Sequence, residues 1–478
     1  MGLETIGVFA ALALLFVALV PPRARRVLIF VASVVAIYWL QPWLPLRYAD
    51  FLLPTLTLVL TVLGWWLTRP QKKIARTDLQ TLGALLVLVM LMGMNRYLAP
   101  AWRLTPSRPP SPSLLMVVLL LTGLALALLA HFDAARSRQK LSAAVVAMVL
   151  IFILLKTPAL TQFWARGWRQ WVGQDVALAS TADLRWLGFS YVSFRLIHTL
   201  RDRQTGLLPD MDLMSYMSYV LFFPAYISGP IHRAEKFLHD WQNLTTLRGL
   251  DAARLGQGSA RILSGMFKKF VIADTLALGM ALTPELAQQT HSTLALWGLL
   301  YGYALRLYFD FAGYSDIAIG FALLLGIHLP ENFKRPYLKT NITTFWQSWH
   351  ISLSDWARFY IFSPLNRSLL RRKPRPHKTH ILFLGLMATM LTIGLWHGIG
   401  WSFVIWGAWH GLGLFIHKQW SDRTRRWYRQ LKQRPWPMRA WQAFSWALTF
   451  HFVVLGWVWF LLPSPALALH TLLQLFGK

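Results

Sequence analysis

The sequence predicts an all-α membrane protein with many transmembrane helices, and three observations lead to that prediction. Of the 478 residues, 55% are hydrophobic and only 14% are charged, whereas soluble chains average about 25% charged residues. Apolar runs long enough to cross a bilayer recur along the whole chain. Basic residues gather in the short loops between these runs, as the positive-inside rule expects. We therefore expect a polytopic protein of about eleven transmembrane helices, with additional re-entrant and interfacial helices.

The net charge of the chain excludes one class of partner and favours another. The 48 Lys and Arg residues outnumber the 19 Asp and Glu residues, which gives a formal charge of +29. In a soluble protein such an excess would indicate nucleic acid, but no nucleic-acid-binding motif is present and no such partner is expected. Membrane lipids with anionic head groups are the expected partners of the basic loops. The lack of cysteine excludes disulfides, thiolate metal sites and a cysteine nucleophile.

The N-terminal part of the chain consists of six expected spans. These spans end near residues 20, 43, 67, 94, 136 and 155. The first run has no cleavage-site pattern and more spans follow it, which favours a transmembrane helix over a removed signal peptide. A basic turn at residues 21–26 follows that run, so the positive-inside rule places Met1 outside. The loop at residues 95–113 contains five prolines and is expected outside the hydrocarbon, because lipid does not tolerate irregular backbone.

The next part of the chain contains two unusual membrane segments. Residues 157–186 are rich in tryptophan and mixed in charge, which indicates an outer interfacial segment with a helix in the membrane plane. Residues 187–200 re-enter the membrane with Arg195 in an apolar stretch, where a charge is costly and usually paired. The apolar run at 211–227 ends in Ser-Gly-Pro at 228–230, and this break predicts a re-entrant turn that is buried in protein.

Two carboxylates lie around the end of the expected span at residues 297–311. Asp310 and Asp316 lie in an otherwise apolar and aromatic stretch, where an unpaired charge would cost several kcal/mol. Arg306 or Arg195 is the expected partner of these carboxylates. Such a pair would fix helix packing, and we favour this structural role over direct catalysis.

The residue types best suited to chemistry lie between residues 345 and 411. His350 stands in Trp-His-Ile-Ser-Leu-Ser, and His397 and His410 each stand in Trp-His-Gly. Imidazole can take or give a proton near neutral pH, glycine allows close approach, and tryptophan offers an apolar wall. The alternative is that these Trp and His residues belong to interfacial belts. No metal site is expected, because the His-Glu-x-x-His spacing is absent.

The spacing of the histidines implies a hollowed core. Topology places His350 near the cytoplasmic face, and His397 follows at the outer end of the span at 381–395, at about the hydrocarbon thickness. The two rings can meet only if the core is open from one or both faces. Such a site would suit transfer from a cytoplasmic donor to an outside acceptor. The chain then crosses back at 403–415 and enters a strongly basic loop at 418–439, before the last span.

Several segments in this order resemble the membrane-bound O-acyltransferase family, in the bacterial branch of the alginate O-acetylation protein and the teichoic acid D-alanine transfer protein. The matching segments are residues 222–237, 308–316, 330–333, 345–354, 396–398 and 406–411. The resemblance implies a shell of helices around a central funnel, with His397 as the catalytic histidine and His350 at the second family position. The chain departs from the family at Phe359, where relatives carry Asp, so an acidic contact near His350 is not carried over.

The resemblance divides the chain and names further site residues. The expected parts are N-terminal spans with the interfacial segment at 1–186, a catalytic core at 187–417, and the basic loop, last span and tail at 418–478. The residues expected to line or support the funnel are His410, Trp396, Trp349, Asn332, Asp310, Asp316, Arg195 and Ser354.

The function that the resemblance implies is acyl transfer in the bacterial inner membrane. His397 would act as general base on an acceptor hydroxyl, which attacks a thioester carbonyl, while His350 orients the donor. No Gly-x-Ser-x-Gly elbow is present, so a serine acyl-enzyme is not expected. No bound cofactor is expected, because the thioester, acetyl-CoA or an acyl carrier, is a co-substrate. The expected partner is a periplasmic or extracellular acyltransferase, or a polysaccharide.

Three alternatives remain open beside acetyl transfer to a cell-surface polysaccharide. The first is D-alanyl transfer from a carrier protein to a teichoic acid-like polymer. The second is a transporter or flippase, which would explain the broken helices and Arg195 but leaves the Trp-His-Gly motifs without a role. The third is a scaffold whose basic loops recruit partner proteins.

Overall fold

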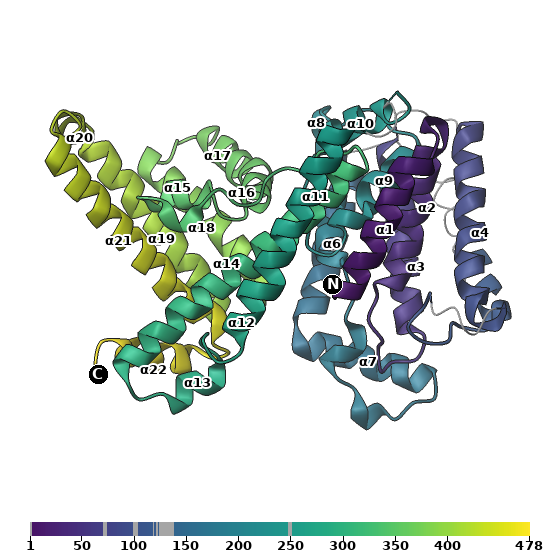
Figure 1. Ribbon diagram of the computed structural model, residues 1–478, viewed down its shortest axis with the longest axis horizontal. Coiled ribbons are helices and arrows are strands. Elements are labelled where there is room, and N and C mark those ends of the chain that lie inside the picture. The colour runs from purple at the N-terminus through teal and green to yellow at the C-terminus, as the bar shows by residue number, and fades with distance from the viewer. Residues whose placement is uncertain are drawn as a thin grey trace. The chain divides into compact units, whose positions relative to one another are not determined.

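All secondary-structure elements in the described part of the chain are helices, which confirms the all-α prediction (Figure 1). The computed structural model describes residues 2–69, 74–98, 104–117, 119–120, 123, 138–246 and 251–478. The predicted fifth span lies largely outside these residues. The chain forms two compact units: the N-terminal unit extends to Ala260 and includes Ala318–Leu329, and the C-terminal unit comprises Arg261–Ile317 and Pro330–Lys478. The division predicted from the sequence at residues 186 and 417 stays a prediction.

The described chain contains six helices that are long and apolar enough to cross a membrane. They are α3 (Ala49–Thr68), α4 (Arg76–Leu98), α6 (Arg138–Lys156), α14 (Thr293–Leu324), α18 (Lys378–His397) and α21 (Pro435–Leu461). Shorter apolar helices include α1 (Leu3–Leu19) and α22 (Pro465–Leu475). The chain is therefore a polytopic membrane protein, while the total of about eleven crossings stays a prediction.

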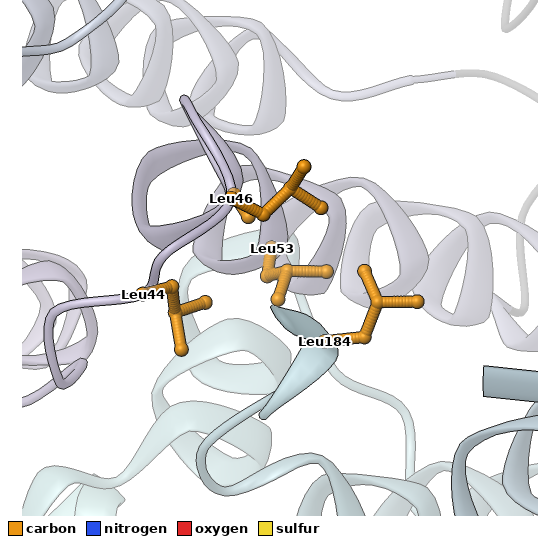
Figure 2. Packing of buried hydrophobic residues seen from close by; sticks show 5 residues of the cluster. Leu44, Leu46, Leu53 and Leu184 are labelled. Carbon is orange, nitrogen blue, oxygen red and sulfur yellow. The ribbon is translucent and has the colours of Figure 1, made fainter. Parts of the chain in front are cut away.

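The N-terminal unit is a helical bundle with a packed polar and apolar interior. Its remaining helices are α2 (Arg25–Trp39), α7 (Pro158–Trp171), α8 (Phe189–Thr205), α9 (Leu213–Leu221), α10 (Ala234–Asn243) and the first part of α11 (Ala252–Met266). One core cluster joins the loop before α3 to the segment before α8 and contains Leu44, Leu46, Leu53 and Leu184 (Figure 2). Burial of each leucine contributes about 1.5–3 kcal/mol.

The predicted interfacial segment forms α7 and two short 3-10 turns. Pro158 occupies the first turn of α7, where its missing N–H leaves no bond unmade. Arg169 of α7 pairs with Asp183 of the following turn at 2.5 Å, and both side chains are buried. The hydrogen bond to Asp183 raises the pKa of the Arg169 guanidinium. This effect is larger than that of burial, which lowers the pKa. This ion pair fixes the segment that leads into α8.

The predicted turn at 228–230 is a buried, irregular stretch of backbone. It follows a 3-10 turn at Phe223–Ala225, and Gly229 and Pro230 are both buried. A Cβ atom on Gly229 would collide with the backbone of Ala225, so only glycine fits there.

The C-terminal unit contains the segments with the candidate histidines. Its shorter elements are a π-helical turn at Phe267–Ala273, α12 (Asp274–Ala277), α13 (Pro284–Gln289), α15 (Ile342–Trp346), α16 (Ile351–Ala357), a π-helical turn at Arg358–Phe362, and α17 (Ser363–Leu370). Two helices occupy much of the predicted basic loop at 418–439. The end of α19 (Trp401–Arg423) extends into it, and α20 (Arg425–Leu431) lies at its centre. Most of the segment at 418–439 is therefore helical, and its place on the cytoplasmic side between two spans stays a prediction.

Candidate functional site

Close packing of α18 against α19 positions two of the three candidate histidines. His397 is the last residue of α18, and His410 lies in the middle of α19. A Cβ atom on Gly407 would lie 2.7 Å from the carbonyl oxygen of Met390, so the two helices approach as closely as their backbones allow. Glycine at this crossing therefore sets the separation of the helices and with it the placement of the two imidazoles.

His397 is half-buried between aromatic side chains. Its ring centroid lies 4.4 Å from that of Trp396, 4.7 Å from that of Phe460 and 5.7 Å from that of Trp406. Among the three histidines it is the most exposed, since His350 and His410 are both buried. An accessible imidazole with apolar walls suits proton transfer to or from a bound substrate.

His350 lies in a strained turn at the start of α16. Its backbone is in the left-handed region, with φ of 43° and ψ of 54°, which is uncommon for a residue other than glycine. Its ring stands edge-on to Phe311 at 4.6 Å and lies 6.1 Å from Trp396. The imidazole is buried, and its Nε2 atom has no hydrogen-bond partner among the described residues. Burial lowers the pKa of His350 to about 3, so the ring is neutral at physiological pH.

Asn332 holds the strained turn of His350. The Asn332 carbonyl accepts a hydrogen bond from the Ile351 amide at 2.9 Å. Its side-chain oxygen accepts from the hydroxyl of Ser352 at 2.6 Å, and its amide nitrogen donates to the hydroxyl of Ser315 on α14 at 3.1 Å. The fully buried Asn332 therefore connects the His350 turn to a long helix. Its role is to position His350.

His410 is enclosed and has a packing role in this structure. Its side chain is fully buried, and its Nδ1 atom accepts a hydrogen bond from the indole of Trp346 at 3.4 Å. Nε2 therefore carries the proton and has no partner among the described residues. A Cβ atom on Gly456 would lie 3.0 Å from this Nε2, so α21 covers the ring.

The three histidines belong to one continuous series of aromatic rings. Trp396 contacts both His350 and His397, and Trp406 contacts both His397 and His410, with a centroid distance of 4.9 Å for the last pair. The ring of Trp396 thus lies in contact with both His350 and His397 and links the two histidines. The placement follows from α18 and α19 turning back on each other between the two Trp-His-Gly motifs.

The remaining predicted residues near His350 support it by packing. Trp349 is buried and lies 5.0 Å from Trp457 and 5.2 Å from Phe333, measured between ring centroids. Ser354 is half-buried, and its hydroxyl donates to the carbonyl oxygen of Trp349 at 3.3 Å. These two residues stabilise the turn from α15 to α16.

The two carboxylates on α14 pair with cations that the sequence analysis did not select. Asp316 accepts from Arg261 at 2.7 Å and also pairs with Lys268. Asp310 pairs with Lys269 at 2.7 Å. The expected partners, Arg306 and Arg195, were therefore wrong. The true partners lie on α11 and the π-helical turn after it, and their proximity to α14 depends on tertiary packing.

Arg195 lies in the N-terminal unit and binds backbone carbonyls. Its guanidinium donates to the carbonyl oxygen of Val220 at 2.7 Å and to that of Ala225 at 2.5 Å, and its side chain is fully buried. Arg195 thus holds the end of α9 and the 3-10 turn that follows. The sequence does not indicate that a buried arginine binds backbone carbonyls, because every residue has a carbonyl group.

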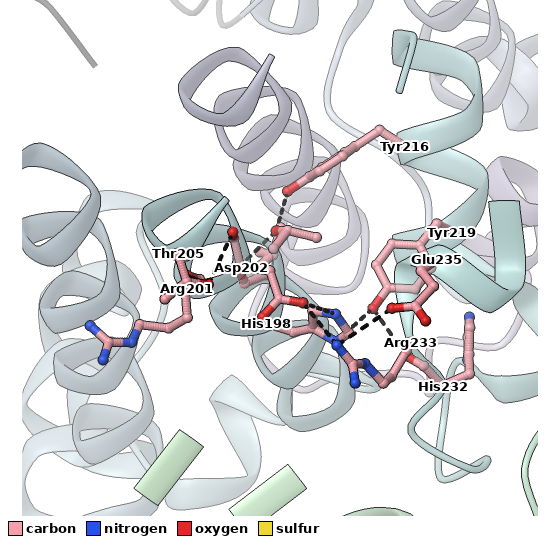
Figure 3. Close-up of polar contacts among 11 residues, drawn as sticks. His198, Arg201, Asp202, Thr205, Tyr216, Tyr219, His232, Arg233 and Glu235 are labelled. Carbon is pink, nitrogen blue, oxygen red and sulfur yellow. Dashed lines mark hydrogen bonds and ion pairs between the residues drawn. The ribbon is translucent and has the colours of Figure 1, made fainter. Parts of the chain in front are cut away.

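A second buried polar network that sequence reasoning missed lies in the same unit (Figure 3). His198 lies 3.0 Å from the carboxylate of Asp202, through Nε2, and 3.3 Å from the hydroxyl of Tyr219, through Nδ1. The Tyr219 hydroxyl donates to the carbonyl of His232 at 3.0 Å, and Arg233 reaches Asp202 at 3.4 Å. The network ties α8 and α9 to the chain after the buried turn at 228–230.

No group of three or more His, Asp or Glu side chains within the described ranges is arranged to hold a metal ion. The side chains gathered around His397 are aromatic and apolar. Their arrangement suits proton transfer by imidazole inside an apolar enclosure.

Comparisons with known proteins show what this chain is similar to. A family model described as MBOAT, membrane-bound O-acyltransferase family, matches residues 136–459. A teichoic acid D-alanyltransferase of Streptococcus thermophilus is 33% identical over 58% of this chain and 68% of its own length. A probable alginate O-acetylase of Pseudomonas putida is 37% identical over 61% of this chain and 54% of its own length. A peptidoglycan O-acetyltransferase of Helicobacter pylori is 33% identical over 55% and 47%, respectively. The matched region thus spans about half the length of these two O-acetylating relatives.

Proposed function

The chain belongs to the membrane-bound O-acyltransferase family, and on that premise we propose that it transfers an acetyl group from a cytoplasmic thioester to hydroxyls of a cell-surface polysaccharide. The observation that carries the proposal is the position of His397, an accessible imidazole at a helix end inside an aromatic enclosure. An enclosure of low dielectric strengthens each interaction with the developing charge.

The proposed reaction uses the two histidines in different roles. His397 accepts the proton of the acceptor hydroxyl as the oxygen attacks the thioester carbonyl. The C–O ester bond forms, the C–S bond breaks, and the leaving thiolate takes the proton from the imidazolium of His397. His350 is neutral and buried, and its Nε2 atom is available to orient the donor by a hydrogen bond.

The names of the relatives support acetyl transfer and also define the second candidate. Two of the three named relatives are O-acetyltransferases, and the probable alginate O-acetylase has the highest identity of the three, at 37%. The teichoic acid D-alanyltransferase, at 33%, favours D-alanyl transfer from a carrier protein as the alternative. Family membership supports neither the transporter nor the scaffold hypothesis.

The proposal includes the location of the protein and its partners. The protein is integral to a membrane, and we place it in the bacterial inner membrane with its N-terminus outside, following the positive-inside rule. Acetyl-CoA or an acyl carrier supplies the acyl group as a co-substrate, and the enzyme needs no bound cofactor. The proposed partner is a periplasmic or extracellular acyltransferase, or the polysaccharide itself.

Mild alkaline release of esters from the surface polymer tests the proposed acyl group. We expect acetate, measured by mass spectrometry, in cells that make the protein, and none above background in cells that lack its gene. Release of D-alanine in place of acetate would assign the protein to carrier-dependent transfer. No protein-dependent ester of either kind would refute the proposed activity.

A further inference from the structure

In the C-terminal unit α20 joins α19 to α21 (Figure 1). A large groove is lined by residues of these three helices. Its volume is about 800 Å³, within the ~300–1,000 Å³ range of small-molecule sites. Side chains of all three helices line it, together with residues just before α15. None of the candidate catalytic residues lines this groove.

The lining of the groove combines an apolar part and a polar part. The apolar part includes Trp420, Trp441 and Phe444, and Trp420 and Phe444 expose 50% and 56% of their surface. The polar part includes His417 and Arg425. An occupant that matches both parts must have a long apolar portion and a polar group beside it.

The excess of basic residues around the groove favours an occupant whose polar group is negatively charged. Between residues 418 and 439 the chain has eight basic residues and one acidic residue, Asp422. Lys418 and Arg425 both pair with Asp422, at 2.6 Å and 3.2 Å. The Arg425 side chain is 65% exposed, so this pair is weak. The positive-inside rule places the groove at the cytoplasmic leaflet, which carries anionic lipids.

From this arrangement we propose that the groove binds one anionic glycerophospholipid, with an acyl chain against the aromatic part and the phosphate at Arg425. The floor of the groove includes Phe452, which stacks on Trp409 at 4.9 Å and lies 5.8 Å from the ring of His410. A bound lipid would therefore support the outer wall of the aromatic series that contains the histidines. The proposal does not depend on the reaction that the protein catalyses.

Native mass spectrometry of the full-length protein in non-ionic detergent tests the proposal. Phosphatidylglycerol and phosphatidylcholine are titrated separately, and we expect one phosphatidylglycerol to bind at least about tenfold more tightly. Arg425→Gln should weaken phosphatidylglycerol binding about tenfold, because a charge-assisted bond to phosphate is lost. Arg429→Gln is the matched control, since it removes the same charge from α20 without lining the groove.

A second pair of variants tests the apolar part. Ser445 is half-buried in the lining, and Ser445→Trp should fill the groove and abolish the bound lipid. Ala443→Trp places the same ring at an exposed position of α21 outside the lining and should leave binding unchanged. Thermal unfolding of each variant confirms that the fold is retained.

Three outcomes would overturn the proposal. Equal affinity for phosphatidylcholine would remove the selection of an anionic head group. An equal effect of Arg429→Gln would show general attraction to a basic surface. Displacement of the lipid by coenzyme A at equimolar concentration would assign the groove to the soluble thioester donor.

Discussion

The backbone of His350 shows how a single residue is held in an unfavourable conformation at this site. A left-handed backbone costs a residue with a side chain about 1–3 kcal/mol. The hydrogen bonds of Asn332 to Ile351, Ser352 and Ser315 offset that cost and fix the direction of the imidazole. The ring can then remain next to Trp396 without a hydrogen bond of its own to the described protein atoms.

Substitution of Asn332 tests this positioning role. Asn332→Ala should lower the free energy of unfolding by about 1–3 kcal/mol, because it removes the buried hydrogen bonds of the Asn332 side chain to the hydroxyls of Ser315 and Ser352. Thermal unfolding in detergent measures the loss. Ser354→Ala removes one half-buried hydroxyl with a long bond and serves as the control. Equal losses for the two variants would contradict the role of Asn332.

The buried imidazole of His350 also predicts a pH dependence of stability. Burial lowers its pKa in the folded protein to about 3, below the ordinary value of about 6.5. As pH falls from 6.5 toward 3, the unfolded chain binds a proton that the folded protein does not, so stability decreases by up to about 1.4 kcal/mol per pH unit. His350→Gln should reduce this slope between pH 6.5 and 4.5, measured by unfolding at each pH. Identical slopes for wild type and variant would refute the burial of a neutral ring.

At the scale of secondary structure, α18 and α19 form the framework of the site. Gly394, Gly407 and Gly411 each lack a side chain where the facing helix approaches. Gly407→Val should therefore force the helices apart and destabilise the protein by about 1–3 kcal/mol, with loss of His397-dependent transfer. Gly400→Ala is the control, because nothing lies within 4 Å of its added Cβ and its φ is −155°. A Gly407→Val protein with wild-type unfolding temperature and transfer rate would be inconsistent with this framework.

The ion pairs between α11, the π-helical turn and α14 differ in strength. Asp316 is nearly buried and has two cationic partners, whereas the side chain of Asp310 is 50% exposed. Asp316→Asn should cost about 1–3 kcal/mol, after allowance for the partly exposed Arg261 and Lys268. Asp310→Asn should cost less than about 1 kcal/mol. Chemical unfolding of both variants gives the comparison, and a larger loss for Asp310→Asn would reverse the assignment.

At the scale of the whole molecule, the fold class predicted from the sequence is confirmed, and the role of the histidine motifs stays a prediction. Hydropathy alone selects the long helices, because lipid requires apolar runs of fixed length. The Trp-His-Gly motifs draw attention to His397 and His410, because each places an imidazole between a tryptophan and a glycine. The structure adds that His410 is enclosed under Gly456, which depends on a helix distant in the sequence.

Partners that depend on packing could not be predicted from the sequence. Lys268 and Lys269 precede an apolar run, as topology-determining residues do, and nothing in that pattern indicates a bond to α14. Arg195 binds backbone carbonyls, which every residue possesses. Most of the segment at 418–439 is helical, although its basic composition does not predict a helix.

His397 is proposed to be the general base of acyl transfer. The ester content of the surface polymer measures this role in the cell. Acetate is released by mild alkali and measured by mass spectrometry in cells with wild-type protein, His397→Ala and the exposed-histidine control His291→Ala. We expect an ester content at least about 100-fold lower for His397→Ala at an equal protein level, since general bases contribute about 10²–10⁴-fold, and no change for His291→Ala. Undiminished acetate in His397→Ala cells would refute the role of His397 as general base.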